Sequence, residues 1–175
     1  MPGEYPAKVA KDFVEKTCSF LHGKFGFYVY QNCYEGKNAA TVLVDGERVR
    51  FDIILFQTRR DGSSSSGILQ NKINYFCECK WRKNPKNLKY ELKKFLKKAL
   101  KTVPEIQGQC SDNFGFIFIC NTPFEVSQEN LQDIEFLREF LNSSYSTAQL
   151  THLSNRVGIL ILTDWFIEIT FKGGI

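Results

Sequence analysis

Apolar residues recur at intervals of three and four along three segments of the chain, which is the spacing that places them on one face of a helix. The segments are residues 7–22, residues 85–103 and residues 127–141. Gly23 and Pro104 follow the first two segments, and both residue types end helices. Ser127 can cap the third, because a serine side chain accepts a hydrogen bond from an unpaired N–H of the first turn. The pattern predicts three amphipathic helices.

Short apolar runs between and after these helices predict strands. The runs are residues 25–31, 40–44, 48–57, 73–81, 114–120 and 158–162, with a last edge strand at Ile167, Ile169 and Phe171. Asp45-Gly46 predicts a tight hairpin between the second and third runs, because a type I′ turn needs positive φ at both central residues. Residues 58–74 include Arg59, Arg60 and four consecutive serines, a composition that predicts a flexible loop.

The order of elements is a helix, a strand meander, and then helices alternating with strands. This order predicts an α/β fold in which a mixed β-sheet is flanked by helices. The length of 175 residues suits one unit, and no internal repeat divides it, so a single domain over residues 1–175 is expected. No run of about 18 apolar residues predicts a membrane span, and the first residues lack a signal-peptide pattern. A cytoplasmic protein is therefore expected.

The six cysteines lack the paired Cys-x-x-Cys spacing of a structural zinc site. They fall in apolar settings that predict strands or helices. Buried reduced thiols are the favoured interpretation over disulfides or metal ligands, because an unpaired cysteine packs as a small hydrophobic residue.

Charge is distributed unevenly along the chain. Between Lys80 and Lys101 there are ten basic residues and one acidic residue, a net charge of +9, whereas the rest of the chain carries −5. So much like charge on one helix favours an anionic partner over an ordinary solvated face. Lysine and arginine neutralise nucleic-acid phosphates without selecting bases. The residues predicted to bind nucleic acid are Arg82, Lys83, Lys86, Lys89, Lys93, Lys94 and Lys97.

Two carboxylates interrupt apolar runs in predicted strands, Asp52 in Phe51-Asp52-Ile53 and Glu78 in Cys77-Glu78-Cys79-Lys80. A carboxylate there is costly to desolvate unless it meets a cation or a hydrogen-bond donor. Phosphodiester hydrolysis uses hard divalent ions such as Mg²⁺, which select carboxylate ligands. If the two strands are neighbours, one ion could bridge them. Lys80 would project from the same face as Glu78, because side chains alternate along a strand.

The tripeptide Glu-x-Lys occurs three times, beginning at Glu35, Glu78 and Glu91, so by itself it is not informative. Its context separates the three. Glu35 falls in a predicted loop and Glu91 on a predicted helix surface, whereas only Glu78 falls in a strand that follows an Asp-bearing strand. The simpler alternative is that Asp52 and Glu78 form structural ion pairs with Lys80 or Arg50.

These residues resemble the PD-(D/E)XK nuclease superfamily, the restriction-endonuclease-like fold, and within it the Mrr-like and RecB-like branches. The resemblance covers residues 7 to 121, through Asp52, the Glu78-Cys79-Lys80 motif, the basic helix and the strand after it. It implies that Asp52 and Glu78 bind Mg²⁺ or Mn²⁺ and that Lys80 positions the attacking water or helps to deprotonate it. Some members add a glutamate of the first helix to the metal site, and Glu15 is the candidate here.

The resemblance also implies function and partners. The primary expectation is a metal-dependent nuclease, a DNA endonuclease of restriction or antiviral defence systems, with RNA as the open alternative. A homodimer, or association with a sensor or ATPase subunit, is the expected assembly. The RecB-like branch often carries Gln-x-x-x-Tyr on the following helix, where this chain has Asn87 and Glu91. The other candidates are a non-catalytic nucleic-acid-binding module of the same fold and a protein-interaction domain that uses the basic helix.

Overall fold

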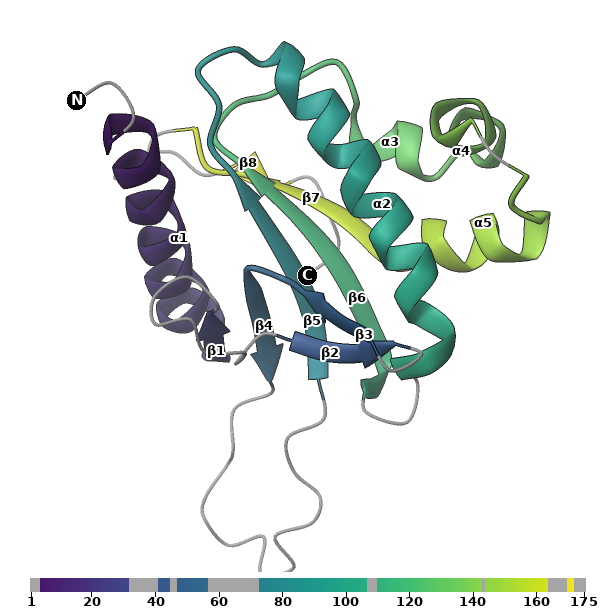
Figure 1. The fold of residues 1–175 in the computed structure, drawn as a ribbon, viewed down its shortest axis with the longest axis horizontal. Coiled ribbons are helices and arrows are strands. Elements are labelled where there is room, and N and C mark those ends of the chain that lie inside the picture. Colours follow the sequence, from purple (N-terminus) through teal and green to yellow (C-terminus); the bar gives the residue numbers. More distant parts are fainter. Residues whose placement is uncertain are drawn as a thin grey trace, which may run out of the picture.

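The computed structural model describes residues 4–31, 41–44, 47–56, 73–106, 110–142, 144–163 and 170–171. Figure 1 shows a β-sheet with helices packed against it, and the predicted mixed α/β class is confirmed. The helices are α1 (Glu4–Phe25), α2 (Lys86–Ile106), α3 (Gln128–Leu131), α4 (Ile134–Leu141) and α5 (Thr147–Ser154). The strands are β1 (Tyr28–Gln31), β2 (Thr41–Val44), β3 (Glu47–Arg50), β4 (Ile53–Phe56), β5 (Ile73–Lys80), β6 (Cys110–Cys120), β7 (Val157–Ile161) and β8 (Thr170–Phe171).

The main sheet has six strands in the order β1-β4-β5-β6-β7-β8, and β2 pairs with β3 in a separate two-stranded sheet. Strand β4 is antiparallel to β1 and β5, and β8 is antiparallel to β7, whereas β5, β6 and β7 are parallel. Parallel neighbours need a crossover connection, which α2 supplies between β5 and β6 and α3 to α5 supply between β6 and β7. Strand β5 therefore lies inside the sheet with a neighbour on each side.

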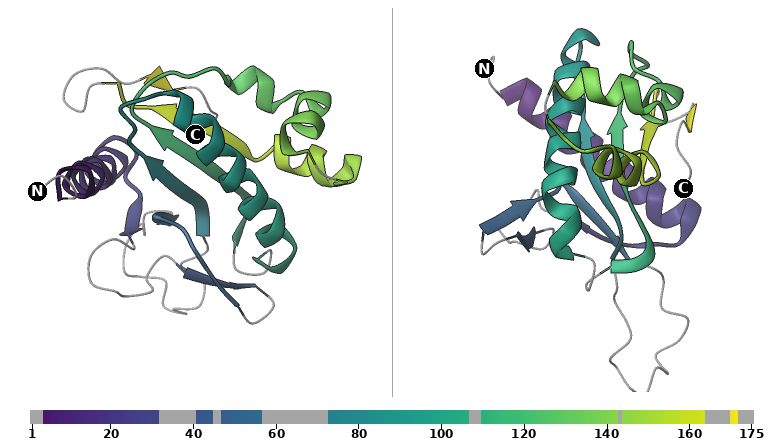
Figure 2. Two further views of the ribbon diagram at one scale, coloured as in Figure 1. Left: turned by 45° about the horizontal axis from the view of Figure 1, so that its top comes forward. Right: turned by 90° about the vertical axis from the view of Figure 1, so that its right-hand side faces the viewer.

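The two faces of this sheet are covered by different helices. Helix α1 buries Phe13 and Leu21 against one face, together with Cys77 and Cys79 of β5. The other face carries the larger apolar cluster, in which Phe76 of β5 packs with residues of α2, α4 and α5. Figure 2 shows the sheet between α1 and α2. Because side chains alternate along a strand, the two charged residues of β5, Glu78 and Lys80, project with Phe76 toward α2.

The run predicted as one strand over residues 48–57 is two strands. Strand β3 pairs with β2, whereas β4 pairs with β1 and β5. Between them Phe51 is 1% exposed and belongs to the larger apolar cluster. The single-strand prediction is wrong because the chain passes from one sheet to the other at Phe51 and Asp52. The predicted turn at Asp45-Gly46 and residues 58–72 of the predicted loop, with Arg59 and Arg60, lie outside the described residues.

Helix boundaries differ from the prediction in four places. Helix α1 continues through Gly23 to Phe25 and is followed by Gly26, whose φ is positive. Helix α2 continues past Pro104, where a proline in the last turn removes only one hydrogen bond of the helix. Ser127 caps α3 as predicted, but Asp133 then caps α4 separately, so the third predicted helix is divided. Helix α5 lies in a polar stretch for which no helix was predicted. Ser146 and Gln149 begin it with reciprocal side-chain to backbone hydrogen bonds.

The described cysteines bear out the prediction of reduced thiols. Cys77, Cys79 and Cys120 are buried free thiols, and Cys18 is partly buried. Cys33 lies outside the described residues.

None of the described helices combines the length and the apolar character needed to cross a membrane.

Candidate active site

Asp52 occupies the point where the chain leaves one sheet for the other. The β4–β5 register pairs Ile53 with Cys77, so a continued ladder would set Phe51 opposite Cys79. Instead, the Cys79 backbone N–H donates to Oδ2 of Asp52 at 2.9 Å. The carboxylate replaces a backbone acceptor at the end of the ladder, and this hydrogen bond holds it beside β5.

Glu78 lies on β5, next in sequence to the residue that anchors Asp52, and the two carboxyl groups interact directly. The pKa of Asp52 is raised from 3.8 to about 7, chiefly by burial, then by the charge of Glu78 and a hydrogen bond with its side chain. The Cys79 N–H and the Lys80 charge lower it without offsetting these effects. Two carboxyls this close resist ionising together, so a doubly charged cation would suit the pair better than a proton does.

Lys98 of α2 is the cation that neutralises Glu78. Its Nζ lies 2.5 Å from Oε2 of Glu78 and donates to the Arg50 carbonyl oxygen at 2.7 Å. The same ammonium stands 4.6 Å from the centre of the Phe51 ring. An ion pair at Glu78 was one of the alternatives that the sequence left open, but its partner is neither Lys80 nor Arg50.

Lys80 is held by Glu91, which the sequence assigned to an ordinary helix surface. That assignment is wrong, because the Glu91 side chain is only 13% exposed and lies 3.6 Å from Nζ of Lys80 and 3.0 Å from the Arg82 guanidinium. Burial alone would raise the pKa of Glu91, but the charges of Lys80 and Arg82 outweigh it and lower the pKa. The Arg82 backbone is fixed in turn by reciprocal hydrogen bonds with the Asn121 side chain, at 2.9 and 3.0 Å.

Both ion pairs follow from the path of the chain. Helix α2 returns over the sheet in the direction opposite to β5, so the end of the strand faces the start of the helix (Figure 1). Glu78 and Lys80 lie two residues apart on one strand face, and Lys98 and Glu91 lie seven residues apart on one helix face. Each strand charge meets a helix charge of opposite sign. The seven-residue spacing was visible in the sequence, but the strand residues that it meets were not.

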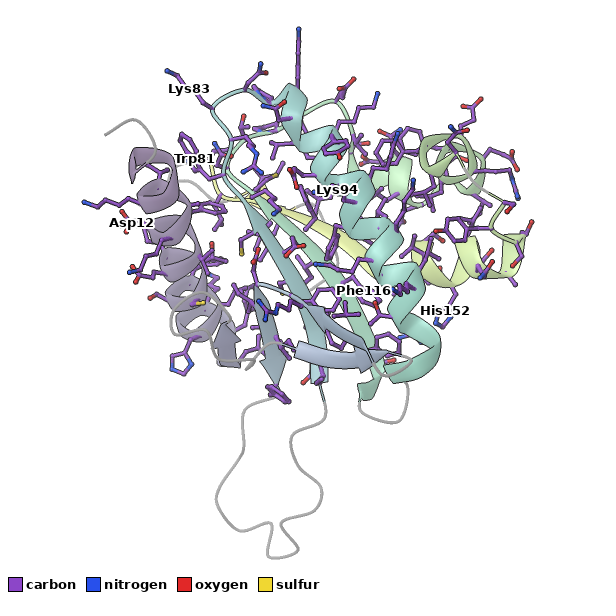
Figure 3. The ribbon with its side chains drawn as sticks, in the orientation of Figure 1. Asp12, Trp81, Lys83, Lys94, Phe116 and His152 are labelled. Carbon is purple, nitrogen blue, oxygen red and sulfur yellow. The ribbon has the colours of Figure 1, made fainter. Side chains whose placement is uncertain are left out.

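The seven cations predicted to bind nucleic acid separate into two groups. Arg82 is engaged by Glu91, Lys89 lies 3.5 Å from Glu125, and Lys93 stands 5.3 Å from the Phe140 ring centre. Lys83, Lys86, Lys94 and Lys97 are exposed to solvent, as is Lys89, and Nζ of Lys94 lies 5.3 Å from the centre of the Tyr90 ring. Figure 3 shows Lys83 at the turn before α2 and Lys94 midway along that helix. The exposed group is the part of the predicted surface that a large anionic ligand can reach.

Glu15 is not brought to the carboxyl pair. It is exposed on α1, the helix that covers the opposite face of the sheet from Glu78 and Lys80. Among the residues that the structure describes, no group of three or more His, Cys, Asp or Glu side chains could hold a metal ion. A metal bound here would therefore depend on Asp52 and Glu78, with its remaining ligands from water, backbone oxygens or substrate.

Comparison of the chain with protein-family models and with curated proteins gives no match. The arrangement must therefore be interpreted through its own chemistry. It combines a buried carboxyl pair, an ammonium group on the same strand face, and a cationic helix that passes over both.

Proposed function

We propose that this chain is a metal-dependent nuclease that hydrolyses phosphodiester bonds, with DNA as its substrate. The observation that carries the proposal is the buried carboxyl of Asp52 beside Glu78, because burial first and the charge of Glu78 second raise the pKa of Asp52 to about 7. Burying two like charges together opposes folding, and carboxyls perturbed in this way concentrate at functional sites. The exposed cations of α2 beside the pair suit a polyanionic substrate.

The residues present fit a divalent cation. Asp52 and Glu78 supply the carboxylate oxygens that Mg²⁺ and Mn²⁺ prefer, and Asp52 would release its proton to take that role. The Cys79 N–H orients Asp52 by donating to its Oδ2. The bound ion would polarise the phosphate and lower the pKa of an attacking water.

Lys80 would act on the substrate. It projects from the same strand face as Glu78, and Glu91 holds its ammonium group while 26% of the side chain stays exposed. From there it would donate a hydrogen bond to a phosphate oxygen or orient the attacking water. Glu91 would keep the ammonium group in place.

We extend the proposal to the fold, as a restriction-endonuclease-like core. Its support is the order of elements, with Asp52 entering β4, Glu78 and Lys80 on the adjacent β5, and then α2 and the parallel strand β6. The sequence resemblance to that superfamily implies products with a 5′-phosphate and a 3′-hydroxyl.

A non-catalytic nucleic-acid-binding module is the second candidate, and one contact favours it. Lys98 lies 2.5 Å from Glu78, so the site has a cation of its own and needs no metal to neutralise that carboxylate. In such a module the carboxyl pair would be structural, and the exposed face of α2 would carry the binding.

The test is cleavage of plasmid, linear duplex and single-stranded substrates with Mg²⁺, with Mn²⁺ or with EDTA. The proposed nuclease cleaves with either ion, not with EDTA, and not when Asp52→Asn replaces the wild type. Asp12→Asn is the matched control, because Asp12 lies on α1 at the opposite face of the sheet. Salt-sensitive binding of nucleic acid without cleavage under any condition would instead support the binding module.

A further inference from the structure

Tyr90 stands out on the solvent face of α2. Its side chain is 63% exposed, the highest value among the large hydrophobic residues that the structure describes as exposed. The other such residue, Phe25, is 39% exposed and packs against the rings of Phe20 and Phe27. The ring of Tyr90 is instead approached by a cation, since Nζ of Lys94 lies 5.3 Å from its centre.

Cations flank this ring on its own helix face. Lys86 and Lys94 lie four residues before and after Tyr90, and Lys97 lies seven residues after it, so all four share one face of α2. All three lysines are exposed. The face therefore offers one flat aromatic ring surrounded by positive charge.

The same face borders the candidate active site. Tyr90 precedes Glu91, the residue that holds Lys80 and Arg82. The charge of Lys94 also contributes to lowering the pKa of Glu91, which places Lys94 within electrostatic reach of that ion pair. A strand bound along this face would thus run past the lysine that we assign to catalysis.

We propose that this face binds an unpaired nucleic-acid strand, with one base stacked on Tyr90 and the adjacent phosphates on Lys94 and Lys97. The inference rests on the proposed function, because it names the form of the substrate at the same site. Bases in a duplex are already stacked within the helix and cannot cover an isolated ring, whereas an unpaired base can. Lysines alone would suffice for a duplex backbone, so they leave the exposed ring without a role.

The experiment measures binding apart from cleavage. Labelled single-stranded and hairpin-duplex oligonucleotides of equal charge are titrated with Asp52→Asn protein, which retains the face but lacks the proposed metal ligand. Tyr90→Leu keeps apolar area and helix propensity but removes the ring, and Tyr90→Phe keeps the ring. We expect Tyr90→Leu to weaken single-strand binding about tenfold or more, to leave duplex binding unchanged, and Tyr90→Phe to match the parent protein.

Lysine variants supply the second measurement. Lys94→Ala and Lys97→Ala should each weaken binding of both oligonucleotides and reduce the salt dependence by about one released ion. Lys24→Ala on α1 is the control, since it removes an exposed lysine on the other side of the sheet. Melting temperatures measured alongside establish that every variant is folded.

Several outcomes would overturn the inference. One is that Tyr90→Leu binds the single strand as well as its parent does, and another is that it loses both oligonucleotides equally; either result removes the stacked base. Binding of an acidic polypeptide such as polyglutamate, together with no binding of either oligonucleotide, would make this a protein-docking surface. Cleavage by the wild type with Mg²⁺ is scored separately. Ring-dependent single-strand binding without cleavage defeats the nuclease alone, and cleavage without ring dependence defeats the stacked base alone.

Discussion

The two faces of β5 carry different kinds of side chain, one apolar and the other charged. On the α1 side, Cys77 and Cys79 are buried in an apolar cluster, and burial raises the pKa of both thiols, so they stay neutral. On the α2 side, Glu78 and Lys80 meet the charges of Lys98 and Glu91. The first face contributes stability by excluding water. The second also brings the carboxyl groups of Asp52 and Glu78 together, which stability alone does not explain.

The difference between the faces teaches where to look for chemistry. Ion pairs between β5 and α2 account for two of the carboxylates, because each has a cationic partner. They do not account for Asp52, whose carboxyl is buried beside Glu78 and has a pKa near 7. This carboxyl is the observation on which we base the proposed metal site.

The largest expected effect on cleavage comes from a substitution on the α2 side of β5, compared with one on the α1 side. Glu78→Gln keeps the shape of the side chain but removes a charge that would hold the ion, so cleavage with Mg²⁺ should fall by about a thousandfold. Cys77→Ala, one residue earlier, should lower the melting temperature and leave cleavage per folded molecule within severalfold. Initial rates on the same substrate, corrected for folded fraction, measure both. Equal losses would mean that the faces are not separate in function.

Lys80→Ala should have the next largest effect, because it removes a hydrogen-bond donor to the reacting phosphate or water. We expect turnover to fall by about a hundredfold with little change in Mn²⁺ affinity. Glu91→Gln should lower turnover by about tenfold, since Lys80 loses its partner but keeps its charge. Lys24→Ala, an exposed lysine of α1 on the other side of the sheet, is the control. If Lys80→Ala weakened Mn²⁺ binding as strongly as turnover, its role would be to support the metal ligands.

The stability of the metal-free protein should depend on pH through Asp52. Its pKa of about 7 in the folded state exceeds the ordinary 3.8, so the folded protein binds an extra proton between these values and stability falls as pH rises from about 4 to 7. The loss should be about 2 to 4 kcal/mol. Asp52→Asn should abolish this dependence and melt several degrees higher than wild type at pH 8 in EDTA. Parallel melting curves of the two proteins from pH 5 to 8 would show that Asp52 ionises freely.

The smallest effect concerns the cation already present. Lys98→Met removes the ammonium that competes with a metal for Glu78 but keeps the apolar stem of the side chain. Mn²⁺ affinity should rise by roughly three- to tenfold, about 1 kcal/mol, in calorimetric titration. Lys97→Met, an exposed neighbour, should leave that affinity unchanged. Weaker Mn²⁺ binding by Lys98→Met would instead mean that Lys98 positions Glu78 for the ion.

Strand alternation and helix spacing predicted much of this arrangement. They predicted that Glu78 and Lys80 share a face, that the strand before theirs carries Asp52, and that a basic helix follows. They could not predict which helix charge meets which strand charge, because this depends on the position at which α2 packs along the sheet. For that reason Lys98 and Glu91 were not assigned to the site.

Two other features were missed for different physical reasons. The strand over residues 48–57 divides because Phe51 is drawn into the core and Asp52 replaces a backbone acceptor, and both events depend on tertiary contacts. Helix α5, in contrast, has a local sequence signal at its start. Ser146 and Gln149 have the spacing of a capping box, so its start was detectable from sequence.

Binding of Mn²⁺ to the metal-free protein, followed by calorimetry near pH 8, tests the central claim that Asp52 and Glu78 form one cation site. The account predicts saturable binding by the wild type that releases protons, because Asp52 must ionise to take the metal. Asp52→Asn and Glu78→Gln should each abolish it, and Asp12→Asn should bind as the wild type does. Undiminished binding by both Asp52→Asn and Glu78→Gln, or no binding by the wild type, would contradict the account.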